Sequence, residues 1–180
     1  LQAQGHTLSN LEKGMPLSAL QQQVVTANAY LGAWGIVEAL QRGADIVICP
    51  RVTDAALAIG PAAWKFGWSR QDWDQLASAV VAGHIIECGT QCVGGNYAFV
   101  QEVPDLRVPG FPIAEMHADG SFVITKHEGT GGQISVGTVT AQLLYEIQTA
   151  RYFNPDATVC FDSIQLEQAG TDRVRVHSVK

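Results

Sequence analysis

The sequence predicts an α/β fold in which helices flank a layered mixed sheet and the C-terminal half is rich in β-hairpins. Up to residue 88, stretches with helical periodicity surround one short apolar run, Ala44–Cys49, which is typical of a buried parallel strand. Beyond residue 94, prolines, glycines and short alternating segments indicate strands and turns. We expect the 180 residues to form a single α/β domain or most of one.

The N-terminal half is expected to hold three helices. Apolar residues recur at helical spacing from Ser18, which has a capping-box partner in Gln21, until Gly43, and predict one long, largely buried helix. A second helix is expected through Phe66, with Pro61 as a place where it can break or kink. A third is expected from Gln71 to about residue 88.

The C-terminal half carries a hairpin pattern. Residues 113–118 and 121–125 flank Asp119-Gly120, the pair favoured in two-residue type I′ turns. Apolar residues at helical spacing predict a helix over 135–147, which should pack on the sheet. Residues 158–167 and 173–179 are expected to be two more strands.

Composition and charge argue against several classes of partner. The formal net charge of −6, with eleven scattered Lys and Arg, excludes the basic footprint of a nucleic-acid-binding protein. No apolar run reaches the roughly 20 residues that span a bilayer, and the N-terminus has no signal-peptide pattern, so we expect a cytoplasmic location. The four cysteines are irregularly spaced, which favours reduced thiols. Because the chain starts without Met and stops inside an apparent strand, we expect a fragment that lacks both flanks.

The strongest candidate site is a glycine-rich turn between an expected strand and an expected helix. Backbone N–H groups at such a turn, together with the helix dipole, suit an anion. The turn lacks the phosphate-loop and dinucleotide patterns, and a purely structural turn is the alternative. Its residues are Lys126, His127, Glu128, Gly129, Thr130, Gly131 and Gly132.

Two other stretches carry polar groups near expected element ends. Arg51, Thr53 and Asp54 follow the apolar run, where ligands of open α/β sheets bind, although Thr53 or Asp54 could simply cap a helix. Further on, a permissive glycine-rich loop at Gly89, Gly94 and Gly95 ends at Asn96. Two glycine-rich loops in one domain suggest a ligand cleft.

Just before this second loop come His84, Glu87 and Cys88, which share one helix face and could in principle hold a metal. The ligand set is incomplete, so we predict no metal and favour a core or capping role for His84. Cys88 could be a nucleophile with His84 as its base, but a buried, inert thiol is the better expectation.

The chain resembles the acyclic terpene utilisation AtuA-like family. The resemblance rests on Val25–Ala33, Arg51–Ala55, Gly83-His84 with Glu87–Gly89, Gly94-Gly95, Lys126-His127 with Gly129–Gly132, and Val139–Ile147. Pro50 stands where the family pattern has glycine, which puts a backbone N–H contact to ligand there in doubt. The resemblance implies a role in a pathway that proceeds through coenzyme A thioesters of branched acids.

These observations lead to one functional hypothesis and one alternative. We expect an enzyme of branched-chain or acyclic terpenoid acyl catabolism that binds an anionic substrate group at Gly129–Gly132. His127, Glu128 and Asp54 are the candidate catalytic residues. The candidate substrate-binding residues are Arg51, Thr53, Glu87, Asn96, Lys126, Thr130, Gly131 and Gly132.

The enzyme hypothesis predicts that Arg51, Asp54, Glu87 and Lys126 converge on one cavity, and it loses most of its support if they do not. We predict no cofactor, with a CoA thioester as a conceivable substrate. The alternative is a non-catalytic ligand-binding or structural subunit that associates through tryptophan-rich helices carrying Trp34, Trp64, Trp68 and Trp73. In either case we expect a homo-oligomer or packing against missing parts of the chain.

Overall fold

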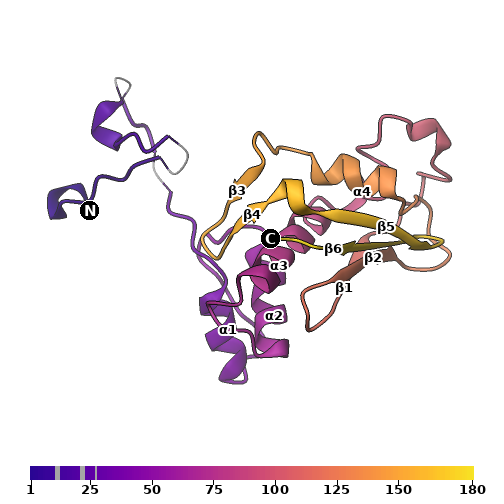
Figure 1. Ribbon diagram of the computed structural model, residues 1–180, viewed down its shortest axis with the longest axis horizontal. Coiled ribbons are helices and arrows are strands. Elements are labelled where there is room, and N and C mark those ends of the chain that lie inside the picture. The colour runs from indigo at the N-terminus through magenta and orange to yellow at the C-terminus, as the bar shows by residue number, and fades with distance from the viewer. Residues whose placement is uncertain (11–12, 21–22, 27) are drawn as a thin grey trace.

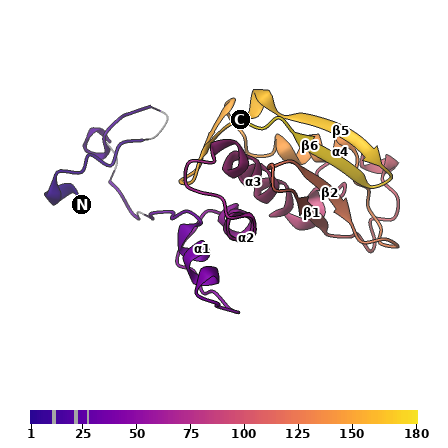
Figure 2. The same ribbon diagram turned by 60° about the horizontal axis from the view of Figure 1, so that its bottom comes forward.

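The computed structural model describes residues 1–10, 13–20, 23–26 and 28–180 (Figure 1). The N-terminal residues trace away from a body of helices and sheet, as Figures 1 and 2 both show. Two short 3-10 turns, Gln2–Gln4 and Leu17–Ala19, lie in this arm. In the described parts of the chain, no helix has the length and apolar character needed to cross a membrane.

The first helix is much shorter than expected. Helix α1 spans Trp34–Gln41, and the described residues before it, apart from the 3-10 turns, are irregular. The expected helix over 18–43 is therefore wrong, and Gln21 of its capping box lies outside the described residues. The β-branched run Val24-Val25-Thr26 disfavours a helix there. Instead α1 begins where both carboxylate oxygens of Asp156 accept the Ala33 N–H at 3.0 Å.

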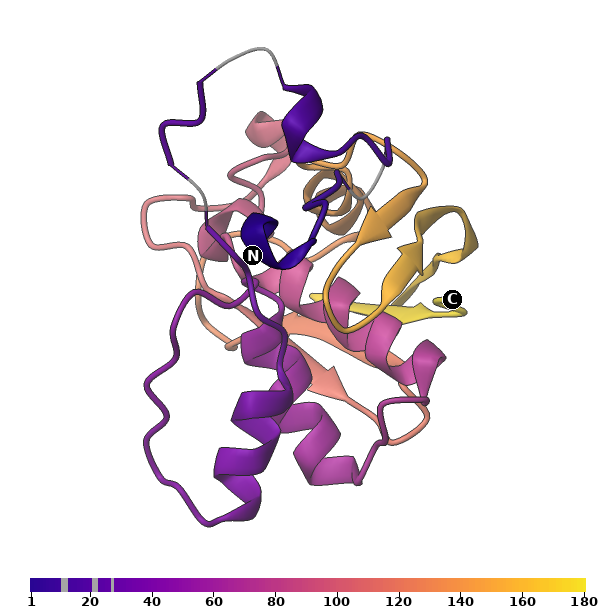
Figure 3. The same ribbon diagram turned by 90° about the vertical axis from the view of Figure 1, so that its left-hand side faces the viewer.

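The expected parallel strand over 44–49 is also not formed. The segment runs along the outside of the helices (Figure 3) and, among the described residues, has no strand partner. Val47 and Cys49 pack against the core, but Ile46 and Ile48 are 84% and 93% exposed. One isolated parallel bridge, Leu31 to Val52, is present beside it. An apolar pattern makes a strand only where a second strand satisfies its backbone.

The next two helices confirm their predictions. Helix α2 spans Ala56–Phe66, contains Pro61 without ending there, and stops at Gly67, whose φ is 67°. Helix α3 spans Trp73–Ile86 and is buried along most of its length. It lies between α2 and the sheet (Figure 2). A Cβ on Gly83 would come 2.6 Å from the Ala55 Cα, so this glycine lets α3 approach the start of α2 closely.

The main sheet is antiparallel, with strand order β1-β2-β6-β5. The expected hairpin is confirmed as β1 (Pro112–Met116) and β2 (Phe122–Lys126). The prediction of a two-residue type I′ turn at Asp119-Gly120 is wrong. Gly120 has a φ of 90° but Asp119 does not adopt positive φ, and the His117 N–H donates to the Ser121 carbonyl in a wider loop. Strands β5 and β6 span Gln165–Gly170 and Arg173–His177.

The remaining elements connect the sheet to the helices. Helix α4 spans Val136–Leu143 and starts at a capping box formed by Ser135 and Thr138; it ends four residues before the expected bound. The expected strand over 158–167 is split: β4 (Thr158–Cys160) pairs with β3 (Arg151–Phe153), a 3-10 turn follows, and β5 belongs to the main sheet. The fold class, α/β with flanking helices and a strand-rich C-terminal half, is confirmed.

Candidate functional site

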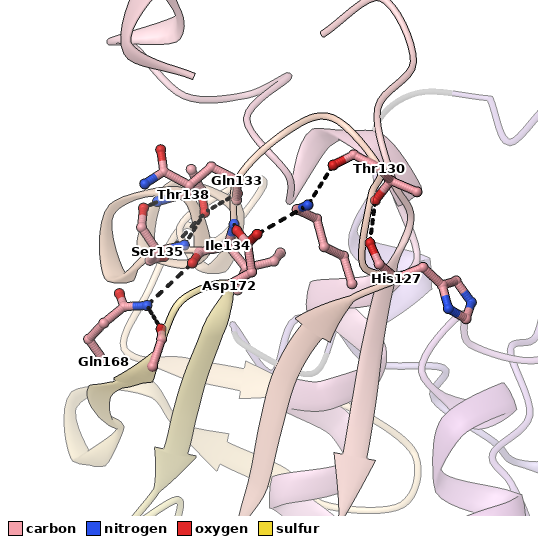
Figure 4. Close-up of polar contacts among 10 residues, drawn as sticks. His127, Thr130, Gln133, Ile134, Ser135, Thr138, Gln168 and Asp172 are labelled. Carbon is pink, nitrogen blue, oxygen red and sulfur yellow. Dashed lines mark hydrogen bonds and ion pairs between the residues drawn. The ribbon is translucent and has the colours of Figure 1, made fainter. Parts of the chain in front are cut away.

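The glycine-rich turn is tied to the protein by its lysine (Figure 4). Lys126 ends β2, and its side chain is 5% exposed. Its Nζ lies 3.1 Å from Asp172 Oδ2 and donates to the Thr130 carbonyl at 2.7 Å. The Thr130 hydroxyl in turn donates to the His127 carbonyl at 2.6 Å. The lysine charge is therefore already neutralised within the chain.

Backbone amides of the turn are also engaged. The Gly131 N–H donates to the Val108 carbonyl at 2.9 Å, and the Gly132 N–H donates to the Pro104 carbonyl at 2.8 Å. The Ile134 N–H donates to Asp172 Oδ1 at 2.8 Å. An anion would need these N–H donors, but they already bond to acceptors within the chain. The turn therefore has a structural role of its own.

Close neighbours leave no room for a side chain at Gly131 and Gly132 of the turn. A Cβ on Gly131 would overlap the Asp105 carbonyl oxygen, and one on Gly132 would come 2.8 Å from the Val93 carbonyl oxygen at a φ of 78°. Gly129 also has positive φ, 76°, but faces open space. His127 and Glu128 beside it are exposed. The exposed part of the turn is therefore 127–129.

The Arg51–Asp54 stretch divides between two environments. The Arg51 guanidinium lies 5.5 Å from the centroid of the Tyr30 ring, in the direction of the N-terminal arm. Asp54 lies just before α2 and is exposed, whereas the Thr53 hydroxyl oxygen is buried. Thr53 and Asp54 do not cap α2 with their side chains.

Carboxylates from three parts of the fold gather near the end of α3. Burial, and then the Glu87, Glu146 and Asp54 carboxylates, raise the pKa of the Cys88 thiol. Burial and the same carboxylates also raise the pKa of the Tyr152 hydroxyl. We call Asp54, Glu87 and Glu146, with Cys88 and Tyr152, the acidic cluster. A negative field of this kind keeps both the thiol and the phenol protonated at neutral pH.

Two hollows share Glu146 of this cluster as a lining residue. A cleft of about 660 Å³ is lined by Asn96, Tyr145, Glu146 and residues of α4. A smaller cavity of about 210 Å³ extends from Glu146 to Tyr152 and Phe153. A ligand in either hollow would meet Glu146, and one in the smaller cavity would also meet Tyr152.

Buried polar atoms lie close to the cluster. Gln142 is 0% exposed; its amide makes no hydrogen bond to a nitrogen or oxygen atom among the described residues, and the Cys88 thiol is its weak hydrogen-bond partner. The Thr53 hydroxyl and Gln91 Oε1 also lack a hydrogen-bond partner within the described structure. Gln142 is near enough to Cys88 to offset part of the rise in the pKa of that thiol. Unsatisfied buried polar groups cost free energy, and in native proteins a catalytic role or a bound water or ion is among the explanations for them.

His84 is a core residue, as expected, and contacts the cluster through Glu87. Its Nε2 lies 3.2 Å from the Leu143 carbonyl oxygen, and its Nδ1 lies 3.3 Å from Glu87 Oε1. The rings of Tyr152 and Phe161 lie 5.7 and 6.0 Å from it. Its Nδ1 therefore faces Glu87, and Cys88, with its raised pKa, is unsuited to be a thiolate nucleophile. Over the described residues, no group of three His, Cys, Asp or Glu is arranged to hold a metal ion.

The expected convergence on one cavity is not met, because none of Arg51, Asp54, Glu87 and Lys126 lines either hollow. Asp54 and Glu87 act on the same two groups, whereas Arg51 and Lys126 make their contacts elsewhere. Sequence reasoning missed Glu146, Gln142 and Tyr152. Of these three residues, Gln142 alone has a recognisable sequence signal, because it is a polar residue between Val139 and Leu143 on the apolar face of a helix.

Comparison with known proteins places the chain in one family. No curated protein and no solved structure matches it. The model of the family described as acyclic terpene utilisation family protein AtuA matches residues 1–180. The chain with this acidic cluster and glycine-rich turn therefore belongs to the acyclic terpene utilisation AtuA family.

Proposed function

We propose that the chain belongs to an enzyme of branched-chain or acyclic terpenoid acyl catabolism, and that the reacting end of an acyl thioester binds at the acidic cluster. One observation carries the proposal: the buried Gln142, whose amide has no nitrogen or oxygen partner among the described residues, acts on the same Cys88 thiol as three carboxylates, and one of these, Glu146, lines two hollows. Membership of the AtuA family supports the terpenoid context.

The charges of the cluster favour the neutral part of such a substrate. Carboxylates repel a phosphate or a free acid, whereas a thioester carbonyl carries no net charge. The Gln142 amide would donate to the carbonyl oxygen and stabilise negative charge that develops there. Glu87, Asp54 or Glu146 would remove a proton from the neighbouring carbon as general base. This assigns proton transfer next to a carbonyl as the reaction class.

The anionic part of the substrate would bind at a different place. The glycine-rich turn remains our proposed anion site, with its exposed segment His127–Gly129 as the accessible part. Neither His127 nor Glu128 is among the groups that act on Cys88 or Tyr152. In this proposal they would contact the substrate away from its thioester carbon. We propose no cofactor and no metal.

Calorimetric titration of the full-length protein with coenzyme A, branched acyl thioesters and simple dicarboxylates tests the proposal. We expect acyl thioesters to bind and the Gln142→Leu protein to bind them at least tenfold more weakly. The His117→Gln protein, altered in a distant hairpin loop, is the control and should bind normally. Failure of every ligand to bind the full-length protein would refute the proposal.

The second candidate is a non-catalytic subunit, and a specific surface favours it. Ile46 and Ile48 project into solvent from a segment without strand partners in the described structure, and Trp64 and Trp73 are also exposed. Unpaired backbone beside exposed apolar side chains favours pairing with another strand, from a second copy or from further polypeptide. Association without any acyl thioester binding would favour this candidate over the enzyme.

A further inference from the structure

A third hollow, of about 390 Å³, lies between the start of α1 and the segment that precedes α2. Small-molecule sites in proteins have volumes of about 300–1,000 Å³, so it is large enough for a ligand. Most of its wall is apolar and includes Trp34, Ile36, Val47 and Val52. None of the described residues that line it belongs to the acidic cluster or lines a hollow at Glu146. We call it the α1 hollow.

One buried carboxylate lines the α1 hollow. Asp156, between β3 and β4, is 6% exposed, and its two oxygens share the Ala33 N–H as a donor at 3.0 Å. A carboxylate can accept about four hydrogen bonds, and within the described structure no other protein donor bonds to this one. A Cβ on Gly32 would overlap the carboxylate, so the backbone leaves room for it at this wall. Asp156 therefore has acceptor capacity that a bound molecule can use.

One cation lines the same hollow. The Arg70 guanidinium, from the connection between α2 and α3, lies 4.5 Å from the centroid of the Trp34 ring, which is a cation–π contact. Burial raises the pKa of the Asp156 carboxyl, and the Arg70 charge opposes that rise. Over the described residues, the guanidinium has no hydrogen bond to an acceptor of the chain. Arg70 can therefore donate to a molecule in the hollow.

These two groups restrict the polar end of a ligand. A carboxylate would be attracted by Arg70 but repelled by the buried Asp156, and an ammonium group would be attracted by Asp156 but repelled by Arg70. A hydroxyl group carries no net charge, can donate to Asp156, and can accept from Arg70. The apolar wall favours an aliphatic body, because burial of apolar surface stabilises a complex. The α1 hollow therefore suits an aliphatic alcohol better than an acid or an amine.

We propose that the α1 hollow is a ligand site separate from the acidic cluster, and that it binds a small aliphatic molecule whose single hydroxyl group lies between Asp156 and Arg70. The site does not depend on acyl thioester binding, because the described residues that line it are not shared with the hollows at Glu146. A ligand here would contact α1, the α2–α3 connection and the β3–β4 connection together. It should therefore stabilise the folded chain.

Three probes with the same eight-carbon chain and different polar ends test the site. 1-Octanol, octanoate and octylammonium are each titrated into the full-length protein by calorimetry, at concentrations at which they do not aggregate. We expect 1-octanol to bind at least about tenfold more tightly than either charged probe and to raise the thermal midpoint. Failure of 1-octanol to show saturable binding, or a charged probe that binds as tightly, would overturn the proposal.

A leucine at Gly35 separates binding from folding. Gly35 lines the hollow, and a Cβ there would meet no atom within 4 Å. Leu is a better helix former than Gly, so we expect Gly35→Leu to keep or raise the thermal midpoint while 1-octanol affinity falls at least about tenfold. Gln41→Leu, at an exposed position of the same helix, is the matched control and should bind normally. Unchanged affinity in Gly35→Leu, or an equal loss in Gln41→Leu, would contradict the site.

Asp156→Asn tests the polar end through a gain of binding. The amide oxygen can still accept the Ala33 N–H, but the negative charge that repels octanoate is gone. We expect octanoate to bind this variant at least about tenfold more tightly than it binds the parent protein, because the attraction of Arg70 is then unopposed. A misfolded variant would lose binding rather than gain it. Octanoate affinity that does not rise would refute the placement of the polar end beside Asp156.

Discussion

Lys126 Nζ lies 3.1 Å from the Asp172 carboxylate, and this ion pair joins the end of β2 to the residue that precedes β6. The same carboxylate accepts the Ile134 N–H, so one aspartate holds the exit from the glycine-rich turn as well as its lysine. The turn is therefore fixed from two sides before any ligand is considered.

Removing one partner of this pair should destabilise the protein. Lys126→Met leaves Asp172 with a charge that has lost its counter-ion in a partly buried place, and we expect a loss on the order of 3 kcal/mol. Chemical denaturation measures the free energy of unfolding. Arg107→Met, which removes an exposed pair with Asp105, is the matched control and should cost less than about 1 kcal/mol. Equal losses in the two proteins would contradict the buried pair.

The glycines of the turn should differ in their tolerance of a methyl group. Gly129→Ala has open space and should cost about 1–2 kcal/mol for its left-handed backbone alone. Gly132→Ala has the same kind of φ and also meets the Val93 carbonyl, so we expect it to cost at least about 1 kcal/mol more. Thermal midpoints and ligand affinities are measured on the same samples. Lost affinity at an unchanged midpoint in Gly132→Ala would show instead that the methyl blocks an anion.

Alkylation of Cys88 should report the carboxylates around it. Burial and these carboxylates raise the pKa of the thiol above its ordinary value, so reactive thiolate appears only at higher pH. Replacing Glu146 with Gln removes one negative charge, and the pH at which alkylation accelerates should then fall. Mass spectrometry after iodoacetamide treatment resolves each cysteine. Cys92, whose pKa burial raises to about 12, serves as the internal reference that stays unreactive. A profile for Cys88 that does not move would contradict the cluster.

The exposed segment before α2 should govern association. Ile48→Asp replaces a side chain that is almost fully exposed, so within one chain it should change stability by less than about 0.5 kcal/mol. If another strand covers this surface, the same change should weaken association at least tenfold. Sedimentation velocity at micromolar concentration distinguishes the two, with Val108→Asp on a distant loop as the control. A parent protein that remains monomeric would contradict the association.

Local patterns predicted the elements whose stability is local. α2 and α3 follow from helical spacing, with Gly67 as the C-terminal glycine of α2, and the β1–β2 hairpin follows from alternation around Asp119-Gly120. The expected helix over 18–43 is restricted to α1 because the β-branched run Val24–Thr26 disfavours helical backbone despite its apolar spacing. The strand over 44–49 failed because pairing depends on a neighbouring strand that spacing does not reveal.

The candidate site was less predictable because it depends on tertiary contacts. Glu87 and Asp54 were identified from their positions near element ends. Glu146 and Tyr152 act on the same groups from the segment after α4, where Glu146 adopts a φ of 62°. The periodicity of the sequence does not predict that backbone geometry. The glycine-rich turn was located correctly, but its internal partners, Pro104, Val108 and Asp172, come from distant loops.

Protection of Cys88 by substrate tests the central claim most directly. The full-length protein is alkylated with iodoacetamide at constant pH with and without a saturating branched acyl thioester, and each cysteine is followed by mass spectrometry. If the reacting acyl end binds at the acidic cluster, Cys88 should react at least fivefold more slowly with the ligand, while half-buried Cys160 should keep its rate. A thioester that binds by calorimetry yet leaves the alkylation of Cys88 unchanged would contradict the assignment of this site.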